Sequence, residues 1–416
     1  MPANRMRTRC PSIGRLLPRS AGARPMRPTR RCEFFWQARR AISRLCMRHN
    51  GAANPRADRQ RWRAAEATRD NKPDVCNQRR KSMKIQSVLR NLALCLIAAS
   101  AALSVADAAA QAKKQVKISH ATAADVGNDN HMVSWIIANY INTNSDTLEA
   151  RIYPANQLGE ERAVVEGMQL GAGATIHIGG TAIHNNFNKR MGVCDLPFLW
   201  RNYEHYHHVI DGKVGEILAA EHEKLGLRVL GWQDSWGYRN VVTTKKEIKK
   251  PEDLKGLKIR TIQTPTYVAA LNAMGANATP MAFGEVYTSL QTGVLDGFEH
   301  ASAVIYTGKY YEVAKYITLT EHLFGPTVTV ISKKEWDGYT DKEKQVVAAA
   351  AKLGQDVNRG LSAQRDAESM EKLKAKGMVV NPIDKSGFIK AAIPLQDQLA
   401  KSLGAEDLLK IIREAK

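Results

Sequence analysis

Short stretches in which hydrophobic and polar residues alternate recur along residues 113–416, and each predicts a β-strand with one buried face. Residues 148–153 read LEARIY, in which Leu, Ala and Ile share one side. Similar stretches lie at 115–119, 175–178, 228–230, 257–260 and 327–331. Between them, stretches such as 131–141 and 160–170 space their apolar residues as an amphipathic helix does. Strands that alternate with helices favour an α/β fold with mostly parallel sheets.

One predicted helix is much longer than the others. Thr340 and Glu343 match a capping box, no proline appears before Pro382, and Gly377 offers a C-terminal stop, which predicts a helix over residues 341–376. A helix of that length would extend about 54 Å at about 1.5 Å per residue. We expect it to bridge two lobes, with two shorter helices broken near Gly354 or Gly360 as the alternative.

The basic charge of the chain is concentrated in one segment. The chain has 61 Lys and Arg against 41 Asp and Glu, a net charge of +20 that suggests nucleic acid or an anionic membrane as a partner. Residues 1–82 hold 22 of the basic residues, five of the acidic ones and no apolar periodicity. We interpret this segment as an untranslated or disordered extension, not as a nucleic-acid-binding arm. We therefore expect no nucleic-acid partner.

Residues 83–112 have the three parts of a secretory signal peptide. Met83 opens a short basic start, an apolar run follows at 92–105, and small residues allow cleavage after Ala110 or Ala112. The apolar run is too short for a comfortable membrane span. We expect translation to start at Met83 and the mature protein to be periplasmic, with an uncleaved membrane anchor as the alternative.

The motifs that usually mark an enzyme are missing from the sequence. It contains no P-loop, no G-x-S-x-G elbow and no H-E-x-x-H zinc motif. Cys194 is the one cysteine that would remain after export, which excludes a disulfide framework and a thiolate metal cluster. His205 and His208 stand one helical turn apart and suit a transition metal, although such a run is more typical of a solvated helix face. We predict no catalysis, no metal and no cofactor.

Residues 251–308 predict a strand, a turn, a helix, a turn, a second helix and a loop. Arg260 falls at the C-terminal end of that strand, the edge where α/β sheets bind their ligands. A guanidinium group can donate two parallel hydrogen bonds to a carboxylate. Arg260 is therefore a candidate anchor for an acid, and a surface charge or an internal salt bridge is the alternative.

Several motifs around Arg260 resemble those of one family. They are the run 254–299, LGEERAVVEGMQLG at 158–171, LPFLWRNYEHY at 196–206 and the segment 236–260 that ends in KIR. Together they are similar to the solute-binding subunits of tripartite ATP-independent periplasmic (TRAP) transporters, of the dicarboxylate-binding type. The resemblance covers nearly all of residues 113–416. It implies a two-lobed periplasmic binding protein with a hinge cleft.

The resemblance also implies roles for individual residues. Arg260 would form the main salt bridge to the ligand carboxylate, and Arg239 would face the cleft as a second arginine. Phe283 would pack on the ligand, and Glu299 would belong to the same site. The alternatives are a hinge ion pair for Arg239, a core position for Phe283 and a scaffold hydrogen bond for Glu299.

Two departures from the family pattern bear on the ligand. His300 replaces a common ligand-binding Asn, and Gln263 lies in a segment where many members have Val-Pro. We expect both residues to contact the ligand, and His300 to add sensitivity to pH. A polar first loop contributes Asp125, Asn128, Asp129 and Asn130. These groups favour a uronate or aldonate slightly over a C4-dicarboxylate or a 2-oxo acid.

The resemblance implies a role in uptake. The lobes, expected at 113–236 plus 325–364 and at 237–324 plus 365–416, would close on the acid about the long helix and the strand crossings near 235–238 and 323–327. The closed protein, which we expect to be a monomer, would then serve a permease of one small and one large integral membrane subunit, driven by an ion gradient. A ligand-presenting partner of a sensor kinase and a secreted enzyme on a similar fold are the alternatives.

Overall fold

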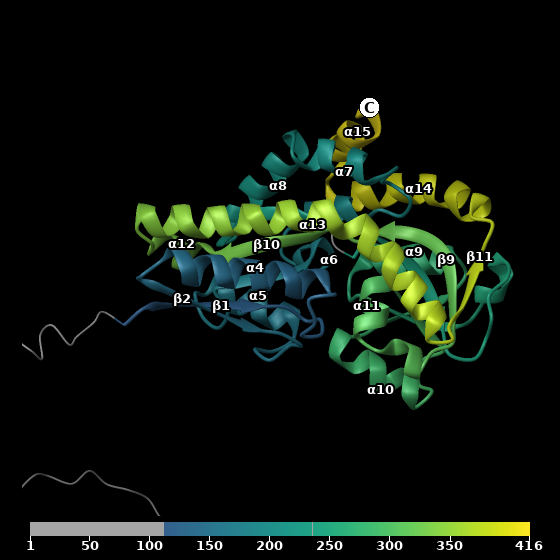
Figure 1. Ribbon diagram of the computed structural model, residues 1–416. Coiled ribbons are helices and arrows are strands. Elements are labelled where there is room, and N and C mark those ends of the chain that lie inside the picture. The colour runs from purple at the N-terminus through teal and green to yellow at the C-terminus, as the bar shows by residue number, and fades with distance from the viewer. Residues whose placement is uncertain (1–111, 235) are drawn as a thin grey trace, which may run out of the picture. The chain divides into compact units, whose positions relative to one another are not determined.

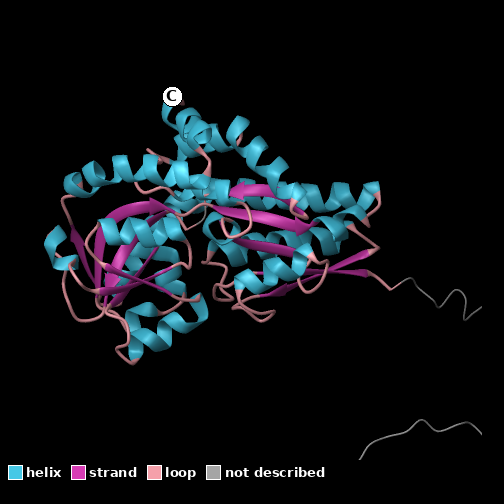
Figure 2. Ribbon diagram, turned by 180° about the vertical axis from the view of Figure 1, so that it is seen from behind, coloured by secondary structure: helices cyan, strands magenta, loops and turns pink. Residues whose placement is uncertain are grey.

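The computed structural model describes residues 112–234 and 236–416. The predictions for residues 1–82 and for nearly all of the signal peptide at 83–112 lie outside the described residues. The described chain forms two halves, each built around one β-sheet, with helices packed against both (Figures 1 and 2).

Two mixed sheets carry the fold. The first has the order β2-β1-β3-β10-β4, formed by β2 (Leu148–Tyr153), β1 (Lys114–Ser119), β3 (Ile176–Gly180), β10 (Thr327–Ser332) and β4 (Leu227–Gln233). The second has the order β11-β9-β5-β8-β6-β7, formed by β11 (Val379–Pro382), β9 (Tyr316–Phe324), β5 (Tyr238–Thr243), β8 (Gly297–His300), β6 (Lys258–Thr261) and β7 (Asn277–Pro280). All six strands predicted from alternation are present.

The direction of two strands differs from the prediction. β1 runs parallel to β2 and β3, and β6 runs parallel to β7 and β8. β10 is antiparallel to both of its neighbours, and so is β5. Parallel neighbours need a crossover that returns the chain to the same end of the sheet. β5 and β10 instead arrive directly from a strand of the other sheet, so the prediction of mostly parallel sheets is wrong for them.

The helices predicted at 131–141 and 160–170 are also present, as α4 and α5. In chain order the α-helices are α4 (Asp129–Asn144), α5 (Glu161–Gln169), α6 (Thr181–His184), α7 (Tyr203–Ile210), α8 (Lys213–Lys224), α9 (Pro265–Ala273), α10 (Val286–Gln291), α11 (Ser302–Thr307), α12 (Lys333–Asp337), α13 (Asp341–Ala375), α14 (Ser386–Leu403) and α15 (Glu406–Glu414). α9 begins where Thr264 accepts a hydrogen bond from the backbone of Tyr267 and Pro265 occupies the first turn.

The long helix is one continuous element. α13 begins with the predicted capping box, in which Thr340 and Glu343 bond each other's backbone N–H, and it is unbroken through Ala375. Its first half packs through Val347 and Ala351 on the core between α4 and the first sheet, whereas Leu373 belongs to a core of the second sheet. α13 therefore bridges both halves, as Figure 1 shows, and the two-helix alternative is wrong.

The C-terminal helices connect the halves once more. α14 contacts both α9 and the 3₁₀ helix η1 (Lys189–Asp195), and α15 contacts α8. Leu408, Leu409 and Ile412 of α15 share a core with α7 and α8. The last helix thus packs beside the first sheet, although residues 365–416 were expected in the second lobe. The exact lobe boundaries stay a prediction.

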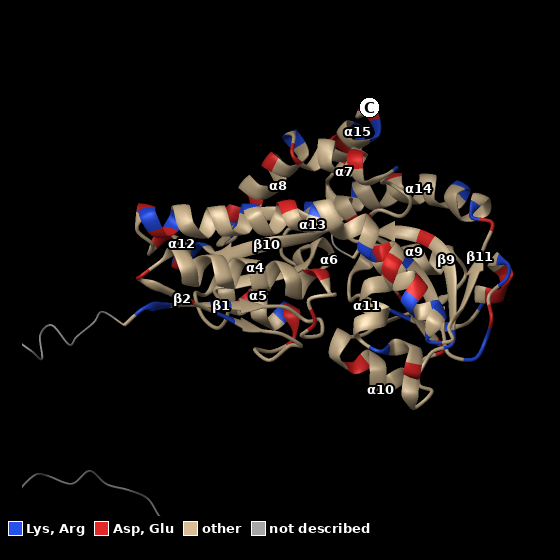
Figure 3. Ribbon diagram, viewed as in Figure 1, with Lys and Arg blue, Asp and Glu red and all other residues tan. Residues whose placement is uncertain are grey.

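The surface of the described residues carries mixed charge. Basic and acidic residues are interspersed along α13 and over the helices near the C-terminus (Figure 3). None of the helices in this part of the chain is both long and apolar enough to cross a membrane. Cys194 is buried as a free thiol in the core of the first half.

Candidate ligand-binding site

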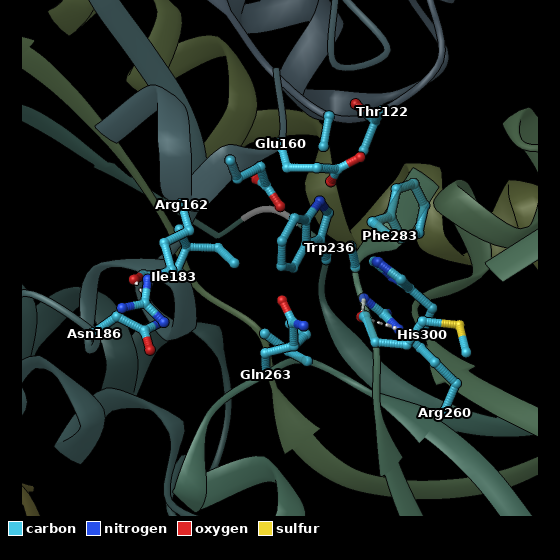
Figure 4. Close-up of a pocket in the computed structure, with 15 residues that line it drawn as sticks. Thr122, Glu160, Arg162, Ile183, Asn186, Trp236, Arg260, Gln263, Phe283 and His300 are labelled. Atoms are coloured by element: carbon cyan, nitrogen blue, oxygen red, sulfur yellow. Dashed lines mark hydrogen bonds between the residues drawn. The ribbon is translucent and has the colours of Figure 1, made fainter. Parts of the chain in front are cut away.

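A hollow opens between the two halves and is lined by residues of both. Its empty space is about 600 Å³ when the open solvent at its mouth is included. The first half contributes Ala121, Thr122, Glu160, Glu161, Arg162, Ile183 and Asn186; the second contributes Arg260, Ile262, Gln263, Met281, Ala282, Phe283 and His300. Trp236 lies between the two groups (Figure 4).

Arg260 sits where the sequence placed it, at the end of β6 and in the wall of the hollow. Its side chain is 3 % exposed, and its Nε and Nη2 donate to the carbonyl oxygen of Met281 at 2.9 and 2.6 Å. Its Nη1 is buried and has no hydrogen-bond partner among the described residues. No carboxylate of the described chain lies within 4.0 Å of this guanidinium group.

Few nearby groups stabilise the buried positive charge of Arg260. Burial lowers the pKa of Arg260 to about 10, and the nearby positive charge of Arg239 lowers it further against the opposing effect of Glu299. The guanidinium group remains charged at neutral pH. The ring of Phe283, which begins the 3₁₀ helix η3 (Phe283–Glu285), lies 5.6 Å from it in a cation–π arrangement. An anion in the hollow would supply the missing partner.

Arg239 and Glu299 form a buried ion pair behind the wall. Both side chains are fully buried on the adjacent strands β5 and β8, and neither lines the hollow. Nε of Arg239 donates to one carboxylate oxygen of Glu299, and Nη2 donates to the other at 2.8 Å. Burial disfavours the charge of Arg239, but the carboxylate of Glu299 raises its pKa above the ordinary value. These contacts match the ion-pair and scaffold alternatives for the two residues.

His300 ends β8 and faces the hollow as a neutral imidazole. Its Nδ1 accepts a hydrogen bond from the backbone N–H of Ala301 at 2.9 Å, which leaves Nε2 to carry the proton. Burial, together with the positive charges of Arg239 and Arg260, holds the pKa of His300 well below its ordinary value. The ring stands edge-on to Phe283, with 5.6 Å between ring centroids. His300 therefore offers a hydrogen-bond donor without a charge.

Of the six site residues predicted from the sequence, Arg260, His300, Phe283 and Gln263 line the hollow together. The predicted polar loop does not line it. Asn128 caps α4 and accepts a hydrogen bond from Thr122, whereas Asp129 pairs with Arg365 of α13. The loop thus supports Thr122, the residue that reaches the hollow.

The acidic wall of the first half was not predicted. Glu160 and Glu161 stand at the start of α5 and face the hollow together with Arg162. Glu161 is 9 % exposed, and its Oε1 has no hydrogen-bond partner among the described residues, with Nε2 of His177 at 3.6 Å. The signal in the sequence was a run of three charged residues at the first turn of an amphipathic helix.

Among the described residues, no group of three or more His, Cys, Asp or Glu side chains is arranged to hold a metal ion. His205 and His208 do not act as a pair. Nε2 of His205 lies 3.0 Å from the carbonyl oxygen of Ile412, and the ring belongs to the contact between α7 and α15.

This chain resembles known solute-binding proteins in both sequence and structure. Residues 141–402 match the family described as "Bacterial extracellular solute-binding protein, family 7". The 2,3-diketo-L-gulonate-binding periplasmic protein YiaO of Escherichia coli is 35 % identical over 272 residues, which are 64 % of this chain and 82 % of YiaO.

Two solved structures are similar over nearly their whole length. The sugar acid binding protein DctPAm of Advenella mimigardefordensis, in complex with galactonate, is 28 % identical with a TM-score of 0.69 and covers 73 % of this chain and 99 % of its own. A TRAP periplasmic solute binding protein of Xanthobacter autotrophicus with bound β-D-galacturonate is 33 % identical with a TM-score of 0.68 and covers 73 % and 100 %.

Proposed function

Because the chain belongs to the bacterial extracellular solute-binding protein family 7, we propose that it captures a small organic acid in the periplasm by closing its two lobes on the hollow. The membership confirms the predicted TRAP type of solute-binding protein and its two-lobed α/β fold. Relatives in this family are binding proteins, which agrees with a role without catalysis.

The observation that carries the proposal is the buried guanidinium group of Arg260. A buried cation without a carboxylate partner is unfavourable, and it becomes favourable once an anion of matching geometry binds. Nη1 points to no acceptor among the described residues. A ligand carboxylate would accept from it, and lobe closure would exclude water and strengthen the ion pair.

The opposite wall favours hydroxyl groups over a second carboxylate. Glu160 and Glu161 outnumber Arg162 on this wall, and they accept hydrogen bonds from hydroxyls but repel another anion. Thr122, Asn186 and Gln263 add neutral polar groups that can both donate and accept. We therefore place the ligand among hydroxylated acids such as uronates and aldonates, ahead of C4-dicarboxylates. The ligands named for the structurally similar proteins, galactonate and galacturonate, are of this class.

The roles of the remaining predicted residues follow from their positions. His300 would donate from Nε2 to the ligand, and Phe283 would pack on its carbon skeleton. Arg239 and Glu299 would hold β5 and β8 in register and would act on the ligand only through their neighbours. After closure, the protein would deliver the acid to a permease of a small and a large membrane subunit.

Calorimetric titration tests the anchor. We expect Arg260→Ala to weaken binding of D-galacturonate or D-galactonate by about 30-fold or more, because the buried cation proposed to pair with the carboxylate is lost. The circular dichroism spectrum should not change, since Arg260 has no ion pair within the described fold.

Arg151→Ala is the matched control. Arg151 forms an exposed pair with Glu149 on the edge strand β2, and neither residue lines the hollow. This variant should bind like the wild type. Unchanged affinity in Arg260→Ala would contradict the proposed site.

A further inference from the structure

Trp236 lies in a connection between the two sheets and also lines the hollow. It lies in the crossing from β4 to β5, the first of the connections between the two sheets. The side chain is 5 % exposed, yet it lines the hollow between the two walls (Figure 4). Its backbone is left-handed, with a φ of +70°, which costs energy for a bulky residue. The surrounding structure must therefore stabilise this conformation.

Two glycines make room for the indole ring. A Cβ placed on Gly180, at the end of β3, would lie 2.7 Å from Cζ3 of Trp236. A Cβ on Gly325, just before β10, would lie 3.2 Å from Cε3. The ring also stands edge-on to His300, with 5.0 Å between centroids, and lies 5.3 Å from the guanidinium carbon of Arg239. Contacts from both halves thus fix the indole at the hollow.

One polar atom of this side chain is left without a partner. Nε1–H of Trp236 is buried and donates to no group of the described chain. By contrast, Nε1 of the buried Trp200 donates to the carbonyl oxygen of Cys194 at 2.7 Å. Buried indole N–H groups usually have an acceptor, and an unmet one is unfavourable. In a side chain that lines a hollow, the natural acceptor is an oxygen of whatever fills it.

We propose that Trp236 is a ligand-binding residue that donates a hydrogen bond from Nε1 to an oxygen of the bound acid. The inference rests on the proposed capture of an acid in this hollow. Because Trp236 belongs to the connection between the lobes, the bond ties the ligand to the hinge itself. A bound ligand would then hold the segment between β4 and β5 in place, and it would also connect the two walls of the hollow.

Trp236→Phe tests the inference with D-galacturonate as the probe. Phenylalanine keeps an aromatic ring but removes the N–H group, so affinity measured by calorimetry should fall about tenfold. The change in tryptophan fluorescence on titration with D-galacturonate should largely disappear as well. Gly180→Ala provides a second route, since its methyl group would displace the indole and should reduce both readouts while Trp236 is retained.

Trp135→Phe is the matched control, because Trp135 is 51 % exposed on α4 and does not line the hollow. It should keep both the affinity and the fluorescence change. Wild-type affinity and an unchanged fluorescence response in Trp236→Phe would overturn the inference. The affinity of Arg260→Ala tests the proposed function separately, so that either idea can fail while the other stands.

Discussion

Two arginines close together in the fold have opposite surroundings, and the difference assigns their roles. Arg239 donates two hydrogen bonds to the carboxylate of Glu299, whereas Arg260 donates to a backbone carbonyl and lacks a carboxylate partner in the described chain. Both are buried. Removing one partner of a buried ion pair is strongly unfavourable, so we expect Arg239 and Glu299 to depend on each other within the fold, whereas Arg260 can take an anionic ligand as its partner. The two residues are alike in type and burial, so we base their different expected roles on their different partners.

The buried pair gives a prediction for stability. Glu299→Gln should lower the free energy of unfolding by about 3–5 kcal/mol, because the charge of Arg239 would stay buried opposite a neutral amide. Urea denaturation measures this. Glu149→Gln removes the partner of Arg151 in an exposed pair and should change stability little or not at all. Equal effects of the two variants would show that burial does not distinguish these pairs.

The sequence predicted some of the residues at the candidate site and missed others. Arg260 followed from its place at a strand end, and Phe283, Gln263 and His300 followed from the resemblance. The pairing of Arg239 with Glu299 depends on β5 and β8 being neighbours, although 60 residues separate the two in the chain. Trp236 and Glu161 are recognised through buried atoms without partners. Such atoms appear only after the two halves have been placed side by side.

Among the elements, α13 shows how one helix serves two cores. Gly354 lies where α13 crosses α4, and a Cβ there would be 3.0 Å from Cγ1 of Val133. A Cβ on Gly360 would meet nothing within 4 Å. The first glycine permits close packing of two helices, whereas the second has no neighbour that requires it. Neither breaks the helix, because capping and packing outweigh the low helix propensity of glycine.

A pair of alanine substitutions separates these two roles. Gly360→Ala should raise the free energy of unfolding by about 0.5–1 kcal/mol through helix propensity alone. Gly354→Ala gains the same propensity but must displace Val133, so its stability should be clearly lower than that of Gly360→Ala. Thermal and urea denaturation of both variants measure the difference. Equal stabilisation would contradict a packing role for Gly354.

Local patterns predicted elements well and their partners less well. Strands such as β1, β2 and β10 and the helices α4 and α5 were visible because periodicity is a property of a short stretch. The direction of β5 and β10 was not, because it depends on a chain that passes from one sheet to the other. The position of α15 beside α8 likewise depends on contacts across about 190 residues.

The molecule as a whole buries many titratable groups. Burial is the main cause that lowers the pKa of seven histidines: His120, to about 3, His222 and His322, to about 4, and His131, His184, His205 and His300. Burial also raises the pKa of four carboxyl groups: Asp195, to about 8, Asp129, to about 6, and Asp366 and Glu160. The two sets respond to acid in opposite ways.

The sign of the net effect follows from proton uptake. Below about pH 6.5 the unfolded chain protonates its histidines, whereas the folded protein takes up protons on these seven less readily, so acid favours unfolding. The carboxyl groups with raised pKa hold protons in the folded state and oppose this trend, but they are fewer. Urea denaturation should therefore show a free energy of unfolding lower at pH 5 than at pH 7, by on the order of 2 kcal/mol. Constant or greater stability at pH 5 would contradict this balance.

The repeated crossing of the chain between the sheets has a further consequence. The polypeptide passes from one half to the other between β4 and β5, returns between β9 and β10, and crosses again within α13. Neither half is a continuous stretch of sequence, so neither can be detached by cutting the backbone at one place. A protease that nicks one of these crossings leaves the halves joined through the remaining ones. Resistance to such damage suits the periplasmic role that we propose.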